Sequence, residues 1–189
     1  DRDRPGRSAI HLHAFLGKAR PLSENWIVPV GGFEATDRTR DLVGQVLDSG
    51  RLSYGPMTRE FEKRFAAMHD CRHAVFCNSG TSALHIAIAC LKEAGGWQDG
   101  DEVIVPALTF VATSNMVLTN GLTPVFVDVA PATYNIDSAQ IEAAISERTR
   151  AIMPVHLFGQ PCEMDPILEI AHRHGLRVVE DSAETMFAR

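Results

Sequence analysis

The sequence predicts an α/β domain in which a mostly parallel sheet lies between two layers of helices. Two observations support this fold class. From residue 74 onward, short apolar runs alternate with stretches of helical periodicity. The runs are apolar at nearly every position, which is typical of strands buried on both faces. Because crossover helices bury such strands, we expect a three-layer α/β/α arrangement.

The residues before this region are expected to form an arm and two helices. Residues 1–35 show weak periodicity and are interpreted as an N-terminal arm. A helix is expected over residues 36–48, since Thr36 can cap it and apolar residues recur at helical spacing. Gly50 would end this helix. After a loop, Thr58 is expected to cap a second helix.

Five strands and four helices are expected after that point. The expected strands are residues 74–77, 102–105, 124–129, 151–156 and 177–180. The expected helices are residues 82–93, 112–120, 137–146 and 166–174. Ligands of parallel sheets bind beyond the carboxyl ends of the strands, so the residues that follow each strand are the candidates for a site.

Composition excludes several classes of protein. The 189 residues carry a formal net charge of -6, and 45% of them are hydrophobic. A disordered chain has too few apolar residues to fold, and a nucleic-acid-binding protein carries an excess of Lys and Arg. This chain has no such excess of Lys and Arg, so we expect no nucleic-acid partner. No apolar run is long enough to span a membrane, so we expect no membrane-spanning segment. The four cysteines have no CxxC spacing, which favours free thiols in a reducing cytoplasm.

The first candidate site follows the strand expected at residues 74–77. Gly80 would let a ligand approach the backbone closely, and Thr81 and Ser82 offer hydroxyl and N–H groups at the start of a helix. Those N–H groups and the helix dipole favour a phosphate. A simple capped turn would give the same pattern, and the segment lacks the glycine spacing of dinucleotide and Walker-type sites.

Aromatic, imidazole and carboxylate side chains follow the later strands. Phe110 could stack on a planar ring or belong to the core, and His156 could contact a ligand or be a satisfied core histidine. Asp181 follows a buried strand, where a carboxylate is costly without a cation, although it could also cap the next element. Together with the phosphate site, the aromatic face and the carboxylate would hold a phosphorylated aromatic ring.

At this point seven motifs, in order and spacing, resemble the DegT/DnrJ/EryC1/StrS family of pyridoxal-phosphate (PLP) sugar aminotransferases. They are SGRLSYGP (49–56), NSGTSAL (78–84), DEVIVP (101–106), TFVAT (109–113), PVFVDV (124–129), HLFGQP (156–161) and ED (180–181). The resemblance implies the large domain of the aspartate-aminotransferase fold, PLP fold type I. It places this domain at residues 36–189 and implies that the domain is incomplete at its C-terminus.

The resemblance implies roles for the candidate residues. The backbone N–H groups of Thr81 and Ser82, beside Gly80, would bind the phosphate of pyridoxal 5′-phosphate. Phe110 would stack on its ring, and Asp181 would pair with its ring nitrogen and keep that nitrogen protonated.

Further residues of the family site are expected with less defined contacts. Tyr54 and His156 would contact the substrate, and Asp128 lies in a family motif near the site. Glu184 would approach the phenolic oxygen of the cofactor, where the family usually has Gln or His. A Glu can donate a hydrogen bond there only when it is protonated.

The resemblance also implies an activity. A homodimer with a shared active site would transfer an amino group from an amino acid, expected to be glutamate, to a keto-sugar nucleotide. Lys18, Lys63 and Lys92 do not match the Schiff-base lysine of the family, which is expected beyond Arg189. Two alternatives stay open: a keto-sugar dehydratase, in which His replaces that Lys, and a non-catalytic or regulatory homologue, which Glu184 favours.

Overall fold

The computed structural model describes residues 34–188 of the chain. The chain divides into two compact units, Asp1–Ser53 and Tyr54–Arg189. The expected arm, residues 1–35, lies almost wholly outside the described residues. No helix of the described part is long and apolar enough to cross a bilayer.

The described part of the first unit is helix α1 (Asp37–Asp48). As predicted, it follows Thr36, whose side chain accepts a hydrogen bond from the Thr39 N–H at 3.1 Å. This N-cap satisfies one of the amides that the first turn leaves open. None of the residues of α1 is buried.

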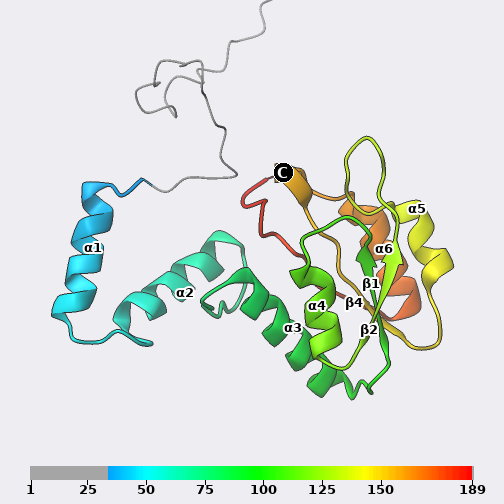
Figure 1. The fold of residues 1–189 in the computed structure, drawn as a ribbon, viewed down its shortest axis with the longest axis horizontal. Helices are drawn as coiled ribbons and strands as arrows, with labels where there is room; N and C mark the ends of the chain where they lie inside the picture. Colours follow the sequence, from blue (N-terminus) through cyan, green and yellow to red (C-terminus); the bar gives the residue numbers. More distant parts are fainter. Residues whose placement is uncertain (1–33, 189) are drawn as a thin grey trace, which may run out of the picture. The chain divides into compact units, whose positions relative to one another are not determined.

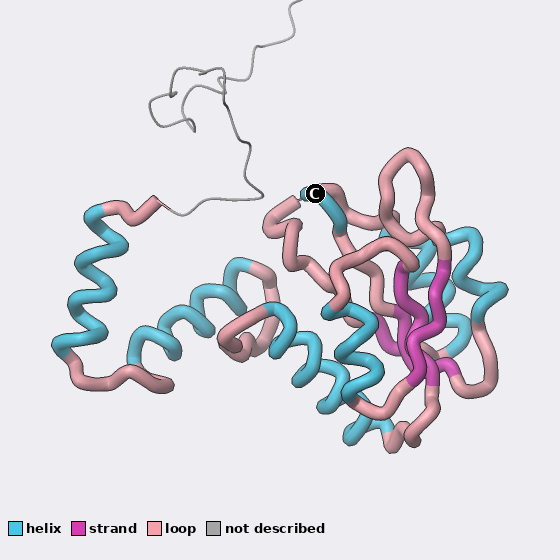
Figure 2. Tube along the Cα trace, viewed as in Figure 1, coloured by secondary structure: helices cyan, strands magenta, loops and turns pink. Residues whose placement is uncertain are grey.

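A four-stranded parallel sheet forms the centre of the second unit (Figure 1; Figure 2). Its strands are β1 (Glu102–Pro106), β2 (Thr123–Val127), β3 (Thr149–Ile152) and β4 (Arg177–Val178). They lie in the order β2-β1-β3-β4, and every neighbouring pair is parallel. The chain adds β2 on one side of β1 and β3 on the other, so the strand order reverses between β1 and β3. Ligands of such sheets bind beyond this point of reversal.

Helices cover both faces of the sheet, as predicted. The helices of this unit are α2 (Pro56–Met68), α3 (Gly80–Gly95), α4 (Ala112–Thr119), α5 (Ser138–Ile141) and α6 (Met164–His174), with short 3₁₀ segments η2 (Glu142–Ala144) and η3 (Leu157–Gly159). Figure 1 shows α3 and α4 on one side of the strands and α5 and α6 on the other.

The side chains of β1 show why both faces are covered. Val103 and Val105 belong to a core cluster with Val117 of α4, whereas Ile104 belongs to a second cluster with Ile167 of α6. Successive side chains of a strand point to opposite faces, so a run of apolar residues needs an apolar layer on each side. These three residues of the five in β1 are each at most 1% exposed. The three-layer α/β/α prediction is therefore confirmed.

The prediction of a strand at residues 74–77 is wrong for the described part of the chain. The segment pairs with no described strand, and Val75 and Phe76 are 73% and 54% exposed. The Phe76 N–H donates instead to Oε1 of Glu62 at 2.9 Å. An apolar run becomes a strand only when its backbone finds a ladder partner.

The helix boundaries differ from prediction for local reasons. Helix α2 begins at Pro56, ahead of the predicted cap Thr58, because a proline suits the first turn of a helix. Helix α3 begins two residues earlier than predicted, because Ser79 caps it and accepts the Ser82 N–H. Asp137 caps α5, which is shorter than predicted and continues as η2.

The later strands end before their predicted bounds. β2 ends at Val127. β3 ends at Ile152, two residues before Pro154, which has no N–H to donate to the ladder. Beyond β3 and β4, an isolated parallel bridge joins Val155 to Asp181. This bridge extends the pairing of the segments that follow β3 and β4 up to the edge of the candidate site.

Candidate functional site

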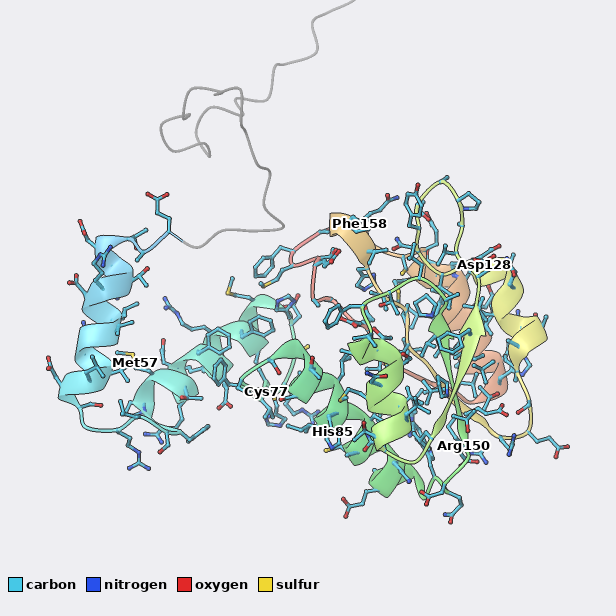
Figure 3. The ribbon with its side chains drawn as sticks, in the orientation of Figure 1. Met57, Cys77, His85, Asp128, Arg150 and Phe158 are labelled. Carbon is cyan, nitrogen blue, oxygen red and sulfur yellow. The ribbon has the colours of Figure 1, made fainter. Side chains whose placement is uncertain are left out.

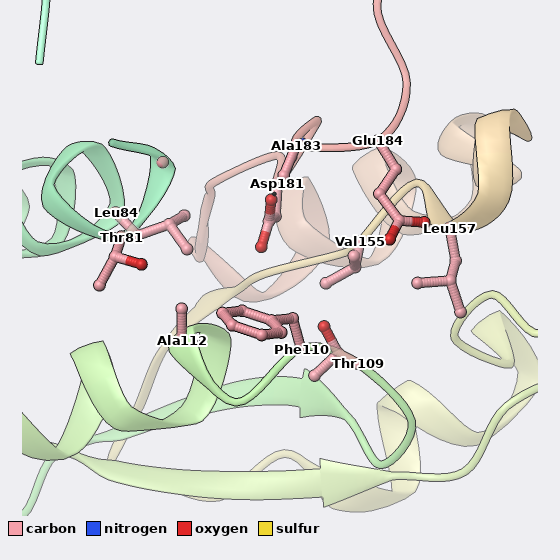
Figure 4. A pocket seen from close by; sticks show the side chains of 11 residues that line it. Thr81, Leu84, Thr109, Phe110, Ala112, Val155, Leu157, Asp181, Ala183 and Glu184 are labelled. Atoms are coloured by element: carbon pink, nitrogen blue, oxygen red, sulfur yellow. Dashed lines mark hydrogen bonds between the residues drawn. The ribbon is translucent and has the colours of Figure 1, made fainter. Parts of the chain in front are cut away.

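A cavity of about 230 Å³ lies at the carboxyl ends of the strands (Figure 4). Its walls come from the start of α3, the turn between β1 and α4, and the segments that follow β3 and β4. Five of the predicted site residues line it: Gly80, Thr81, Phe110, Asp181 and Glu184. They come from segments as far as about a hundred positions apart in the sequence, and the parallel topology brings them together.

The start of α3 forms one wall and presents open backbone donors. The Ser79 side chain accepts the Ser82 N–H at 3.1 Å, so that amide is engaged within the helix. The N–H groups of Gly80 and Thr81 have no acceptor among the described residues. No atom lies within 4 Å of where a Cβ of Gly80 would be. Gly80 and Thr81 therefore present open amides at this wall, whereas the Ser82 amide, which was expected to join Thr81 in binding the phosphate, is bonded to Ser79.

Phe110 forms the opposite wall. It lies in the turn after β1 and is 71% exposed, so the interpretation of Phe110 as a core residue is wrong. Its carbonyl oxygen accepts the Thr113 N–H at 3.1 Å, which anchors the turn to the first turn of α4. Figure 4 shows the Phe110 ring and the Asp181 carboxylate facing one another across the cavity. An exposed aromatic face in a cavity is suited to pack against a ligand.

Asp181 is the buried acid of the site. Asp181 is 7% exposed, and its Oδ2 accepts a hydrogen bond from the Thr113 hydroxyl at 3.0 Å. Its Oδ1 accepts the Ala183 N–H at 3.2 Å, as in an Asx turn, so the carboxylate also serves the local capping role. Within residues 34–188, no cationic side chain forms an ion pair with it. A buried carboxylate held only by neutral donors is suited to a cation supplied from outside the chain.

Glu184 also lines the cavity, and its carboxylate is already in use. Oε2 of Glu184 accepts the N–H of Phe158 at 2.8 Å. Phe158 has a φ of 55°, in the left-handed region that is unfavourable for a residue with a side chain. The sequence gives no sign of this contact, because the partner is a backbone amide 26 positions away.

His156 is placed beside the cavity but does not line it. The residue is 5% exposed; its Nδ1 accepts the Cys162 N–H at 3.0 Å, and its Nε2 lies 3.0 Å from Oε2 of Glu180. Because Nδ1 accepts, the ring proton is assigned to Nε2, which donates to Glu180. Both ring nitrogens are therefore engaged inside the fold, as in a satisfied core histidine.

Tyr54 and Asp128 are also placed away from the lining. The Tyr54 hydroxyl donates to Oε2 of Glu62 at 2.7 Å, and this bond raises the pKa of Tyr54. Asp128 is exposed, and its Oδ1 accepts the Val129 N–H. Of the lysines in the described part, neither Lys63 nor Lys92 lines the cavity.

Two threonines that were given no role in the sequence belong to the site. Thr109 lines the cavity, and its hydroxyl lies 2.9 Å from the hydroxyl of the fully buried Thr113. Their spacing of four residues across a predicted helix start is a weak signal. The pair belongs to the site because Thr113 donates to Asp181, which lies 68 positions away in the sequence.

Comparisons with known proteins identify relatives of this chain. The GDP-perosamine synthase of Caulobacter vibrioides is 51% identical over 150 residues, covering 79% of this chain and 39% of that protein. The UDP-N-acetyl-3-dehydro-alpha-D-glucosamine 3-aminotransferase of Acidithiobacillus ferrooxidans is 47% identical over 173 residues, covering 89% and 46%. The solved structure of E. coli GDP-4-keto-6-deoxy-D-mannose-3-dehydratase with bound hydrated PLP matches with a TM-score of 0.79 and 31% identity, covering 85% and 42%.

The chain spans less than half the length of these relatives. The sequence profile of the DegT/DnrJ/EryC1/StrS aminotransferase family matches residues 34–189, which is most of the chain. The chain therefore belongs to the DegT/DnrJ/EryC1/StrS aminotransferase family.

Proposed function

We propose that this chain forms the cofactor-binding part of a PLP-dependent enzyme that transfers an amino group from glutamate to a keto-sugar nucleotide. One observation carries the proposal: a single cavity combines open helix-start amides, an exposed aromatic face and a buried carboxylate that has no cationic partner within residues 34–188. The relatives named as a perosamine synthase and a 3-aminotransferase of UDP-sugars support a sugar nucleotide as the acceptor. The family resemblance supports a cytoplasmic homodimer with a shared active site.

The donors and acceptors of the cavity fit PLP. The amides of Gly80 and Thr81 would donate to its phosphate, with support from the positive end of the α3 dipole. The Phe110 ring would pack against the cofactor ring. A protonated pyridine nitrogen would supply the cation that Asp181 lacks among the described residues.

Asp181 would be the residue that determines the chemistry. A carboxylate next to the pyridine nitrogen favours its protonated form. The protonated cofactor, when bound, supplies an electron sink for the negative charge that develops on the carbon losing a proton. Thr113 and Ala183 keep the Asp181 carboxylate in place by donating to one oxygen each. We assign no proton-transferring lysine among residues 34–188, because none lines the cavity.

The proposal is tested on the full-length protein with PLP and ¹⁵N-labelled glutamate. PLP binding is measured by absorbance and fluorescence titration, and ¹⁵N transfer to GDP-, UDP- and dTDP-linked keto-sugars is followed by mass spectrometry. We expect saturable PLP binding, a large loss of affinity or turnover in Asp181→Asn, and ¹⁵N in a sugar nucleotide. A wild-type protein that binds no PLP would contradict the proposal.

A keto-sugar dehydratase is the second candidate. It is favoured by the likeness to the E. coli GDP-4-keto-6-deoxy-D-mannose-3-dehydratase, with a TM-score of 0.79. The same assay separates the two activities. An aminotransferase leaves ¹⁵N on the sugar product, whereas a dehydratase yields a sugar that has lost a hydroxyl group and contains no ¹⁵N.

A further inference from the structure

Thr113 makes contacts on two sides of the cavity at once. It is fully buried in the first turn of α4, and its backbone N–H donates to the carbonyl of Phe110 at 3.1 Å. Its hydroxyl lies 3.0 Å from Oδ2 of Asp181 and 2.9 Å from Oγ1 of Thr109. One residue therefore connects the aromatic wall to the buried carboxylate.

The direction of these hydrogen bonds follows from the number of protons. A carboxylate can only accept, so the single hydroxyl proton of Thr113 points to Asp181. The Thr113 oxygen must then accept from Thr109, whose own proton is used in that bond. The Thr109 oxygen, which belongs to the cavity lining, is left as an acceptor.

The hydroxyl of Thr113 is not needed by the helix in which it lies. Helix α4 begins after Val111 without a side-chain cap, and the Thr113 oxygen bonds outside the helix in both directions. A valine has nearly the same shape as threonine but no hydroxyl, so filling this fully buried position does not by itself require a polar side chain. The polar group at this buried position is therefore explained by the site and not by the packing.

We propose that Thr113 is a positioning residue that fixes the Asp181 carboxylate relative to the Phe110 turn, so that a ring-shaped cofactor is held between them. The inference rests on the proposed function, because that cofactor is PLP. Thr113 itself does not line the cavity. It acts through Asp181, by giving Oδ2 a buried donor, and through Phe110, by holding its carbonyl.

The test uses Thr113→Val, which removes the hydroxyl, and Thr113→Ser, which keeps it, in the full-length protein. Thr119→Val is the matched control on the same helix, because the Thr119 hydroxyl bonds only within α4. We expect Thr113→Val to weaken PLP binding by about ten- to a hundredfold, as for loss of a donor to a charged group. We expect Thr113→Ser and Thr119→Val to stay within about threefold of wild type.

A double-mutant cycle with Asp181→Asn shows whether Thr113 acts through the carboxylate. We expect Thr113→Val to change PLP affinity less than about threefold in the Asp181→Asn background. The proposal is overturned if Thr113→Val binds PLP like wild type, if Thr113→Ser is as weak as Thr113→Val, or if the loss is undiminished in the Asp181→Asn background.

The same cycle, measured by urea unfolding without PLP, separates this inference from the proposed function. If the wild-type protein binds no PLP, the proposed function fails and the unfolding cycle decides the contact alone. Non-additive effects of Thr113→Val and Asp181→Asn on unfolding support the connection, and additive effects overturn it.

Discussion

The hydrogen bond from the Phe158 amide to Glu184 holds the turn at residues 157–159, beside the cavity, and its strength can be measured by hydrogen exchange. The Glu184 carboxylate accepts the Phe158 N–H at 2.8 Å, while Phe158 stays in the left-handed region with a φ of 55°. The Phe158 ring is 70% exposed, so burial of the ring does not hold this turn. We predict that Glu184→Ala releases the turn and that the Phe158 amide then exchanges its hydrogen faster.

The size of the effect follows from two opposing contributions. A hydrogen bond to a charged acceptor contributes about 1.5–3 kcal/mol, with the low end appropriate for the exposed Glu184. A left-handed conformation costs a residue with a Cβ about 1–2 kcal/mol, which favours opening once the acceptor is lost. Since about 1.4 kcal/mol corresponds to a factor of ten, we expect Glu184→Ala to speed exchange about tenfold or more. Glu184→Gln keeps a neutral acceptor and should speed exchange about threefold.

Hydrogen exchange of the peptide that contains residues 157–161, read by mass spectrometry at constant pH and temperature, measures this opening. Glu163→Ala is the matched control, because Glu163 is exposed and its side chain makes no cap bond to α6. The control should exchange at the wild-type rate. An unchanged rate in Glu184→Ala, or equal rates in the Ala and Gln variants, would refute the reasoning.

Three further predictions concern the core, the amino end of the sheet and the aromatic wall. The pKa of Asp101 lies below its ordinary value of 3.8. The hydrogen bond from the Gln98 N–H lowers it most, burial raises it, and the hydrogen bond and charge of the Arg150 guanidinium lower it further. Because the pKa is lower in the folded state, ionised Asp101 stabilises the folded state fully above pH 3.8, and this stabilisation is lost as the pH falls below that value. The free energy of unfolding of Asp101→Asn in urea should therefore decrease less steeply below pH 3.8 than that of the wild type. Ile104→Ala should lower the free energy of unfolding by about 2–5 kcal/mol and Ile104→Val by about 0.5–1.5 kcal/mol, whereas a loss below about 1 kcal/mol in the Ala variant would contradict its packing. Phe110→Ala should weaken PLP binding about tenfold in a fluorescence titration and Phe110→Tyr should leave it nearly unchanged, unless the ring makes no contact with the cofactor.

The layers of the fold were predictable because they depend on local periodicity. The run from Val103 to Val105 is apolar at each position, and only a strand with helices on both faces buries all of it. The same reasoning predicted where Phe110 and Asp181 would lie, since each belongs to a segment that follows an expected strand. Parallel topology then places both at one edge of the sheet without further information.

The contacts of the site were not predictable, because they join segments far apart in the sequence. The bond from Thr113 to Asp181 spans 68 positions, and the bond from Phe158 to Glu184 spans 26. Nor does a propensity rule favour a left-handed Phe158, which is held by its neighbours. The strand expected at residues 74–77 was predicted wrongly for the same reason. Its apolar pattern is typical of a strand, but the segment pairs with no strand among the described residues, and the sequence pattern does not show whether a ladder partner exists.

The two ends of the sheet treat their buried acids differently. At the amino end of β1, Asp101 is paired with Arg150 at 2.9 Å and Glu102 with Arg148 at 3.0 Å. Figure 3 places Arg150 at the end of the sheet opposite Asp128 and Phe158.

At the carboxyl end, Asp181 is equally buried, but across the described residues its hydrogen-bond donors are a hydroxyl and an amide, both neutral. Burying a carboxylate without a cation lowers stability. Arginines offset this loss at the amino end of the sheet, whereas no cationic side chain within residues 34–188 offsets it at Asp181. Stability alone does not explain such a difference, whereas the protonated ring nitrogen that we propose as the partner of Asp181 would. Because Asp181 has no cationic partner within residues 34–188, this end of the sheet is suited to bind a cationic group.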